Sequence, residues 1–580
     1  MLSPAQGTED NVATVPLVIG VTSHRNIPAR EMEAVWQRVR DFFARLRHEY
    51  PGLPLVVLSS LAEGGDQWVA EEAIASGIRL IAPLPLKREQ YALDFEAGAA
   101  REHFEYLCDQ AELIELPMIS SGAGVAARGR APVGHERDLH YLQAGVYISQ
   151  HCHVLLAIWD GKMSDRVGGT AQVVRFHLAG VAPAIDERRR GFPRSALLGN
   201  DSERLAYHIV CSRDEADGAP LAPLQPLQTM WRLGERTVAG TEPMPVEFES
   251  TFVHAGAFVD DWKTYAAQIE QPQPYADSVS SDGALGRLYR AADWLAIHFQ
   301  RRVLLSMRTI YTLAALMGFA LMAYSDLPNQ DNMIYVFLTL FVIGIVISQL
   351  ATRRAWHRKY LDYRALAEGL RVQSYWRRAG LSLAGDAEFG RDNFLQKQDV
   401  ELGWIRNVMR GAALEGALEA RPSRPEDVPA VIREWIGDGE QSGQLGYYAR
   451  KAGQRTRTLH VTETLGAASW RVGIGISVLL ALFVRQLGQE AKTDLVALMA
   501  VLSIIAAVRE AYAYKKADKE LIKQYRFMQR IFGEAHRALN RTTDVAEQRD
   551  ILRMLGEAAM AEHVEWALMH RERPLEHGKL

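Results

Sequence analysis

Thr309–Tyr324 (TIYTLAALMGFALMAY), Ser325–Asn332 (SDLPNQDN) and Ile334–Ser348 (IYVFLTLFVIGIVIS) form the stretch that organises this chain. Two apolar runs are separated by a short polar segment that suits a turn. A helix that is apolar on all sides needs either a lipid bilayer or a very large protein core around it. The stretch therefore predicts a transmembrane helical hairpin; a large soluble helical bundle is the alternative.

Basic residues flank this hairpin at both outer ends, while its turn carries Asp326 and Asp331 and no cation. Such a distribution predicts that both outer ends are cytosolic and that the turn lies across the membrane. The flanking cations are Arg301, Arg302, Arg308, Arg353, Arg354, Arg358 and Lys359.

A second hairpin follows, with apolar runs at Val472–Val484 and Leu495–Val508. Cations flank it too, so we expect the same orientation. At about 1.5 Å per residue, the first run covers only about 20 Å of a hydrocarbon core of roughly 30 Å. Trp470 and the adjoining Arg471 and Arg485 can extend it into the membrane interface.

Each hairpin precedes a charged helical segment with a Tyr-Arg pair, Tyr363-Arg364 and Tyr525-Arg526, which indicates an internal repeat. Two pairs of small residues, Ala314 with Gly318 and Gly473 with Ser477, have the four-residue spacing that allows close helix packing. In segments rich in alanine and glycine, the same spacing also arises by chance.

The composition excludes several classes of protein. The chain has 580 residues, enough for about three or four domains. Its 66 basic and 70 acidic residues leave a formal charge of -4, which argues against nucleic acid as a partner. Hydrophobic residues make up 48%, less than a transporter would need. The cysteines Cys108, Cys152 and Cys211 indicate a reducing compartment, and no cleaved signal is expected.

Short apolar runs alternate with helical patterns in the N-terminal half. The helical segments between the runs predict right-handed crossovers and a parallel sheet. The expected fold class is a Rossmann-like α/β domain followed by an all-α membrane region with two helical hairpins. The predicted strands are Pro16–Val21, Leu55–Leu58, Arg79–Leu84, Ala111–Leu116, Val154–Trp159 and His208–Cys211.

Polar and glycine-rich loops follow several of these strands, and ligands bind beyond the carboxyl ends of strands in open parallel sheets. Glycines and a helix N-terminus favour anions, so we expect a phosphate at Gly168–Thr170. Arg25 can pair with a phosphate, and Glu63 or Asp66 can accept from a ribose hydroxyl or a base amino group. The candidate ligand-binding residues are Gly20, Thr22, Ser23, His24, Arg25, Glu63, Gly64, Gly65, Asp66, Asp160, Gly161, Gly168, Gly169 and Thr170.

Each of these features also has a plainer interpretation. Glycines after strands serve to turn the chain, and His24 suits a loop hydrogen bond better than the role of a base. His151, Cys152 and His153 look like metal ligands, but adjacent positions of a strand point to opposite faces. Because no other Cys/His spacing fits zinc, we predict no metal, and we also predict no cofactor and no catalytic residue.

Four groups of motifs lie within residues 14–180: GVTSHRN (Gly20–Asn26), LSSLAEGGDQWVAEEA (Leu58–Ala73), RLIAPLPLKREQYALDF (Arg79–Phe95), and AIWDGK with GGTAQVV (Ala157–Lys162, Gly168–Val174). Together they resemble the SLOG superfamily, a Rossmann-like group of nucleotide sensors. The resemblance implies a nucleotide-derived ligand. Some members hydrolyse nucleoside monophosphates with a PGGxGTxxE motif, whose glutamate is missing here. That difference favours a sensor.

Each cytosolic helix, hairpin and Tyr-Arg helix together resemble the SLATT domain, a two-span effector module found beside such sensors in bacterial conflict systems. Two copies would cover residues 285–400 and 440–580. The resemblance implies that the hairpins form a pore or disrupt the membrane. No span centre carries Asp, Glu, Lys or Arg, so the sequence does not identify an ion pathway.

The sequence thus predicts a multi-pass protein of the inner membrane whose cytoplasmic domain senses a nucleotide signal, in antiphage defence. The expected partners are a nucleotide-derived ligand, the lipid bilayer and further copies of the chain. The alternatives are a membrane-tethered, phosphoribohydrolase-like enzyme and a soluble scaffold with buried hairpins. The remaining predicted parts are a disordered lead (1–14), the sensor domain (15–270), a linker (271–284) and a connector (401–439).

Overall fold

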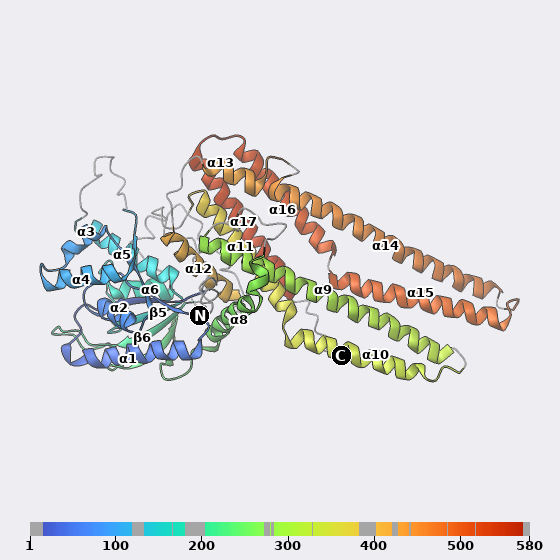
Figure 1. Ribbon diagram of the computed structural model, residues 1–580, viewed down its shortest axis with the longest axis horizontal. Coiled ribbons are helices and arrows are strands. Elements are labelled where there is room, and N and C mark those ends of the chain that lie inside the picture. Colours follow the sequence, from blue (N-terminus) through green and yellow to red (C-terminus); the bar gives the residue numbers. More distant parts are fainter. Residues whose placement is uncertain are drawn as a thin grey trace, which may run out of the picture. The chain divides into compact units, whose positions relative to one another are not determined.

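The computed structural model describes residues 15–118, 133–164, 166–179, 204–271, 279, 283–326, 329–381, 402–419, 427–439, 442–483, 485–516 and 518–571. The chain forms two compact units, Met1–Ala291 with Glu368–Arg424, and Ala292–Ala367 with Pro425–Leu580. The first unit holds a sheet and the second holds long helices (Figure 1). The chain therefore returns to the sheet unit between the two hairpins. The predicted domain boundaries stay predictions.

An eight-stranded sheet forms the centre of the first unit, in the order β4-β3-β2-β1-β5-β6-β7-β8. Neighbouring strands from β4 to β6 are parallel, and the pairs β6-β7 and β7-β8 are antiparallel. The predicted α/β fold class is confirmed. The strands are β1 (Leu17–Ser23), β2 (Leu55–Leu58), β3 (Arg79–Leu84), β4 (Glu112–Glu115), β5 (Val154–Trp159), β6 (Leu205–Val210), β7 (Thr229–Leu233) and β8 (Arg236–Ala239).

The order of the strands reverses beside β1. The chain adds β2, β3 and β4 on one side of β1 and then places β5 on the other side. In the register between β1 and β5, Ser23 at the end of β1 lies opposite Ile158 of β5. Because the crossover helices leave β1 and β5 on opposite sides at such a reversal, a crevice opens beyond the carboxyl ends of the strands.

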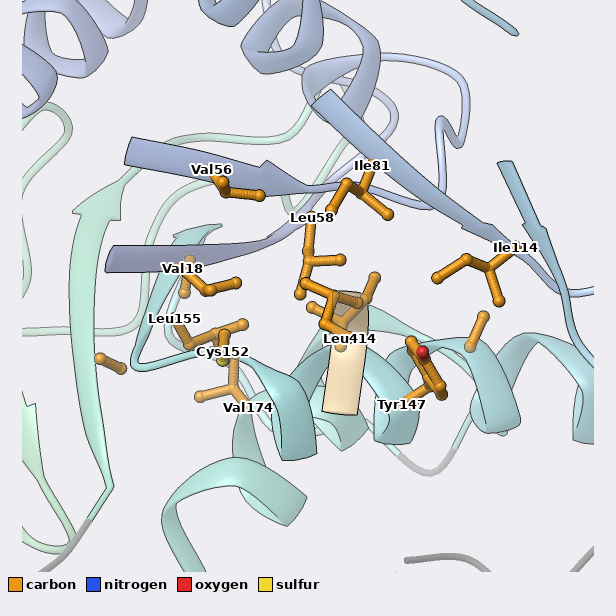
Figure 2. Close-up of a cluster of buried hydrophobic side chains, with 14 of the residues drawn as sticks. Val18, Val56, Leu58, Ile81, Ile114, Tyr147, Cys152, Leu155, Val174 and Leu414 are labelled. Carbon is orange, nitrogen blue, oxygen red and sulfur yellow. The ribbon is translucent and has the colours of Figure 1, made fainter. Parts of the chain in front are cut away.

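One face of the sheet is covered by α5 (His135–His151), α6 (Thr170–Ala179) and α12 (Gly403–Leu418). Figure 2 shows Leu414 of α12 among side chains of the strands, such as Val18 and Leu58, and of α5. All three of these residues are fully buried or nearly so. A segment that follows the first hairpin in sequence therefore completes the core of the sheet unit.

Other contacts fix α12 to the sheet. His153 Nδ1 accepts a hydrogen bond from the Val18 N–H at 3.1 Å, and its Nε2 lies 2.9 Å from the carbonyl oxygen of Asn407. Burial holds the pKa of His153 at about 3, so the ring is neutral and can serve both partners. Arg79 of β3 forms an ion pair with Glu415.

The opposite face carries α1 (Ala29–Glu49), whose Phe42 stacks on Tyr207 of β6 with ring centroids 4.3 Å apart. Tyr207 and its neighbour Ala206 point to opposite faces, as alternation along a strand requires, and Ala206 belongs to the buried cluster on the face that α5, α6 and α12 cover. The remaining helices of this unit are α2 (Gly65–Ala75), α3 (Arg88–Tyr91), η1 (Ala92–Asp94), α4 (Ala99–Gln110) and α8 (Val246–Ile269).

Residues 204–271 contribute more to the fold than the sequence indicated. The strand predicted at His208–Cys211 is found as β6, shifted by a few residues. The antiparallel strands β7 and β8 and the long helix α8 were not predicted. Trp231 of β7 is fully buried against Tyr207, with ring centroids 4.8 Å apart.

The second unit contains the two helical hairpins. Four helices of the described chain are long and apolar enough to cross a membrane, consistent with a multi-pass membrane protein. Their apolar windows are almost uncovered by protein, which argues against burial inside a large soluble core. The helices are α9 (Gly283–Asp326), α10 (Met333–Arg353), α11 (Trp356–Arg378), α13 (Asp427–Val431), η7 (Ile432–Ile436), α14 (Gly443–Phe483), α15 (Gln489–Lys516), α16 (Asp518–Leu539) and α17 (Val545–Arg571).

The internal repeat is visible in the packing. Tyr363 on α11 packs against Phe299 on α9, with centroids 5.8 Å apart. Tyr525 on α16 likewise meets α14, where the Arg455 guanidinium lies 5.9 Å from its ring centroid. In both copies, the Tyr-Arg helix after the hairpin turns back onto the helix before it.

Candidate functional site

The predicted site residues lie around the carboxyl ends of β1, β2 and β5, at the strand-order reversal. The His24 N–H donates to the carbonyl oxygen of Ile158 at 3.0 Å, so the loop after β1 continues alongside β5. Gly65 donates its N–H to the carbonyl oxygen of His24 at 3.4 Å, which brings the loop after β2 to the same place. Three loops from distant parts of the sequence therefore meet.

Two glycines allow this approach. Gly64 has φ +92°, and a Cβ there would lie 2.3 Å from the carbonyl oxygen of Arg25. A Cβ on Gly65 would lie 2.6 Å from Ser23 Oγ. Both positions therefore require glycine so that the start of α2 can pack on the loop after β1, a structural role that serves the site indirectly.

Asp66 on the first turn of α2 is the most unusual group at this edge. Its side chain is buried; Oδ2 accepts from Ser60 Oγ at 3.3 Å, and Oδ1 makes no hydrogen bond to any described residue. Burial raises the pKa of Asp66 to about 7, although the nearby Ser23 and Ser60 hydroxyls and the Arg25 cation favour the ionised form. A buried acceptor without a partner is rare in a folded protein and is typical of a ligand site.

Asp160, which follows β5, has the opposite electrostatic character. Its Oδ1 lies 3.0 Å from His24 Nε2, close enough for an ion pair but at an angle that does not suit a hydrogen bond. Burial alone would raise the pKa of Asp160, but His24 and the backbone N–H of Lys162 hold it below the usual value. This carboxylate is therefore charged at neutral pH and already has protein partners.

The Gly168–Thr170 turn also reaches this edge. Thr170 Oγ1 donates to the carbonyl oxygen of Ser23 at 2.6 Å. The Gly168 N–H donates to the side chain of Gln172, and the Gly169 N–H donates to the carbonyl oxygen of Arg166. Within the described chain, the N–H groups of Thr170 and Ala171 at the start of α6 have no acceptor, as is usual in the first turn of a helix, and a helix N-terminus favours an anion.

The other predicted residues occupy different positions. Arg25 and Glu63 are exposed, and Arg25 forms no ion pair with any described residue. Thr22 is buried near the end of β1. Gly20 lies deeper in the same strand, where a Cβ would come within 2.7 Å of Ile148 on α5; helix packing therefore explains this glycine. Gly161 has φ +82°, and a Cβ there would press on Leu224.

Sequence reasoning missed the side chains that surround Asp66 and the glycine turn. Tyr91 is buried beside Asp66, and Tyr141 of α5 packs against Gly168 and hydrogen-bonds Asp94. No spacing in the sequence connects these positions, because they come from η1, α3 and α5. Ser60 was visible in its loop, but nothing there singled it out as the partner of Asp66.

A separate pocket of about 740 Å³ lies beyond β6, between the start of α1 and residues 212–226. Arg30, Glu31, Arg213 and Glu215 contribute its charged groups. The Leu221 N–H donates to the carbonyl oxygen of Asp160 at 2.8 Å, so the wall of the pocket adjoins the loop after β5. The sequence indicated only a turn-rich polar segment here.

The predicted metal-like trio does not form a cluster. His151 Nδ1 lies 2.8 Å from the carbonyl oxygen of Tyr147 on its own helix, and His153 joins the sheet to α12. Among the described residues, no group of three His, Cys, Asp or Glu side chains could hold a metal ion. Comparison with protein-family models, curated proteins and solved structures finds no match to this chain.

Proposed function

We propose that the chain is a membrane effector whose sheet domain senses a nucleotide-derived ligand and switches the two hairpins. The ligand binds at the strand-order reversal, with its phosphate at Thr170 and Ala171 and a hydrogen-bond donor at Asp66. Switching produces a pore or a membrane defect, in bacterial antiphage defence. The sensor domain is cytoplasmic, the hairpins cross the inner membrane, and several copies act together.

The observation that carries this proposal is the unpartnered Oδ1 of Asp66 at an edge where an anion can also bind. A ligand with both a phosphate and an N–H or O–H donor satisfies both features at once, and a nucleotide has both. To move the hairpins from one arrangement to another, such a ligand must favour one of them by a few kcal/mol, roughly 5.5 kcal/mol for complete switching.

One observation favours a second candidate, a membrane-tethered nucleotide hydrolase. A buried carboxyl whose pKa is raised to about 7 is suited to act as a general acid or base at neutral pH. Against this, the residue at the position of the hydrolase motif's glutamate is Val173. Its side chain packs so closely on Gly145 that a Cβ added to Gly145 would lie 2.4 Å from it. The described site therefore has no carboxylate at the position where that motif places its glutamate.

Binding measurements on the full-length protein in detergent test the site. Small molecules retained during purification are identified by mass spectrometry, and candidate nucleotides are titrated. We expect Asp66→Asn to weaken binding by about tenfold or more at pH 8, where Asp66 is charged, because a hydrogen bond to a charged group contributes roughly 1.5–3 kcal/mol. Glu102→Gln on the exposed surface of α4 is the matched control. Equal affinity for both variants would place the ligand elsewhere.

Function is tested by dye release from vesicles that contain the protein, with and without the retained molecule. Release only with the ligand supports a switch. Product analysis on the same samples separates the two candidates, because a hydrolase liberates the base. A tightly bound ligand that causes neither release nor cleavage would contradict both.

Protonation of Asp66 gives an independent prediction. Its pKa in the folded chain, about 7, is above the ordinary value of 3.8, so its stabilising contribution is complete below pH 3.8 and is lost as pH rises through about 7. We expect Asp66→Asn to melt at a higher temperature than the parent at pH 8, with the difference shrinking as the pH falls. A difference independent of pH would mean that Asp66 is not buried as described.

A further inference from the structure

The end of the first hairpin opposite its turn carries arginines that form no ion pair with any described residue. Arg301 and Arg308 on α9, and Arg353 and Arg354 at the end of α10, are exposed, and none forms an ion pair with any residue that the structure describes. We call these four the arginine collar. Unpaired arginines at the end of an apolar helix are available to an external anion.

The sequence leaves the collar without acidic neighbours. Residues 294–325 and 333–361 contain neither Asp nor Glu. The nearest carboxylates beyond these ranges are already paired: Asp293 lies 3.0 Å from Arg364, and Asp362 pairs with Arg358 and Arg571. The positive charge of the collar is therefore not neutralised within the hairpin.

Two contacts between α9 and the start of α11 show that the collar residues of both helices lie at the same end of the hairpin. The Arg302 guanidinium lies 5.5 Å from the Trp356 ring centroid, and Lys359 Nζ lies 5.2 Å from that of Phe299. Arg301 and Arg308 lie within about 10 Å of Arg302 along the helix axis, at roughly 1.5 Å per residue. Arg353 and Arg354 precede Trp356 by three and two residues.

The collar also combines charge with exposed apolar surface. Arg301, Leu305 and Arg308 share one face of α9, since their spacing is four and then three residues. Leu305 is 65% exposed. Arg301 and Arg308 lie about one helical turn before and after the exposed Leu305. Cations and a tryptophan next to exposed apolar surface are typical of a helix at the boundary between headgroups and acyl chains.

We propose that the arginine collar binds the phosphates of anionic phospholipid headgroups, which makes the first hairpin the lipid-selective one. Arginine suits this role because its planar fork donates two hydrogen bonds to one phosphate, which an ammonium group cannot do in the same geometry. The proposal rests on membrane insertion of the hairpins and is independent of the ligand at Asp66.

The second hairpin differs from the first in how its flanking cations are paired. Three of its flanking cations pair with carboxylates of the protein: Arg509 lies 2.8 Å from Glu510, Lys519 lies 2.9 Å from Glu463, and Arg455 lies 2.5 Å from Asp518. These carboxylates compete with lipid phosphates for the same cations. Two other flanking cations, Arg457 and Arg471 on α14, are exposed and form no ion pair with a described residue. The first hairpin is therefore expected to be more selective for anionic lipid than the second.

The test uses the full-length protein in vesicles of equal parts phosphatidylcholine and phosphatidylglycerol. Lipids that remain on the protein after mild extraction are counted by native mass spectrometry. The parent is expected to retain phosphatidylglycerol in preference. Replacing all four collar arginines by Gln is expected to lower that preference by up to about a thousandfold, since each cation near an anionic surface contributes about 1 kcal/mol.

Two further variants define the site. A control in which Arg38, Lys87, Lys263 and Arg541 become Gln removes four exposed cations elsewhere and is expected to keep the preference. A variant with Lys at all four collar positions keeps the charge but loses the fork, and it is expected to retain less phosphatidylglycerol. If the Lys variant kept the full preference for phosphatidylglycerol, diffuse electrostatic attraction would account for that preference, and the proposed site would be wrong.

Folding and ligand binding are checked on the same samples. Helix content and melting in phosphatidylcholine alone show whether the collar variant is intact, and nucleotide titration shows whether its sensor still works. Loss of lipid preference with normal ligand binding supports the collar alone. If the parent retains both lipids equally, the collar proposal is wrong, whatever the ligand measurements show.

Discussion

The two hairpins share a plan but differ in how they satisfy their polar groups. In each, the helix after the hairpin returns to the helix before it through a Tyr-Arg pair. At the first hairpin, buried Asp362 and partly exposed Arg364 form ion pairs within the protein. The four arginines of the collar form none with a described residue. At the second, three of the flanking cations, Arg455, Arg509 and Lys519, pair with carboxylates. The two hairpins thus resemble each other in how the following helix packs and differ in how their charged groups are paired.

The largest difference is expected at the position before the shared tyrosine, which is Asp362 in the first copy and Gln524 in the second. Asp362 is fully buried and pairs with Arg571 at the end of α17 and with Arg358. Asp362→Asn leaves these cations without their charge partner, which costs roughly 3–5 kcal/mol in a buried pair. We expect a clear fall in melting temperature and faster proteolysis of α17.

Gln524→Ala is the matched change in the second copy. Gln524 is half-buried and makes no hydrogen bond to a described residue, so its loss is expected to change stability by no more than about 0.5 kcal/mol. If Asp362→Asn and Gln524→Ala destabilised the protein equally, the two hairpins would not differ at the position where the largest difference is expected.

A smaller difference is expected between the two predicted small-residue positions. A Cβ on Gly318 would lie 3.0 Å from Ile504 of α15, so the first hairpin packs closely on the second there. Gly318→Leu is expected to cost about 1–3 kcal/mol through overpacking. Disulfide cross-linking between cysteines introduced on α9 and α15 reports the contact directly, and it should be lost in the variant.

Gly473→Leu is the control for that experiment, because a Cβ there meets nothing within 4 Å. It should leave cross-linking unchanged and raise helix stability slightly, since glycine in a helix interior costs about 1 kcal/mol relative to alanine. Disruption by both substitutions would show that both pairs of small residues pack tightly, as the sequence pattern alone suggested.

The smallest effect concerns the arginines of the shared pair. Arg364 lies 3.0 Å from Asp293, with both side chains about one quarter exposed, whereas exposed Arg526 reaches Thr456 Oγ1 only at 3.4 Å. Arg364→Gln is expected to cost up to about 1 kcal/mol and Arg526→Gln close to nothing. Melting at low and high salt checks this, because only the Arg364 effect should shrink as salt screens the pair.

Short-range patterns predicted much of the fold, and long-range contacts explain what they left out. Alternation of apolar runs with helical periods located the strands from β1 to β5. For β1, β2, β3 and β5 the reason is that strands buried on both faces are apolar throughout, whereas β4 is a partly exposed edge strand. The predictions missed β7, β8 and α8, whose positions depend on pairing and packing with partners such as Tyr207 rather than on local pattern. Nothing near residue 414 in the sequence indicated that Leu414 completes the core of the sheet.

For the candidate site, the sequence located the loops but not their chemistry. Glycines and polar residues after strands marked Gly64–Asp66 and Gly168–Thr170 as meeting at one edge, and hydrogen bonds to Ser23 and His24 bring both there. Whether they hold a ligand stays a prediction. The sequence did not separate the two aspartates, because the contrast between Asp66 and Asp160 arises from burial and from neighbours such as Ser60 and His24.

The sequence by itself determined the α/β class, the four apolar helices and the absence of acidic residues around the first hairpin, because each depends on residue type and spacing along the chain. Tertiary structure alone decided the order of strands, the return of α12 to the sheet and the unpartnered oxygen of Asp66. The physical reason is that hydrophobic periodicity is local, whereas burial and hydrogen-bond satisfaction depend on which distant segments the fold brings together.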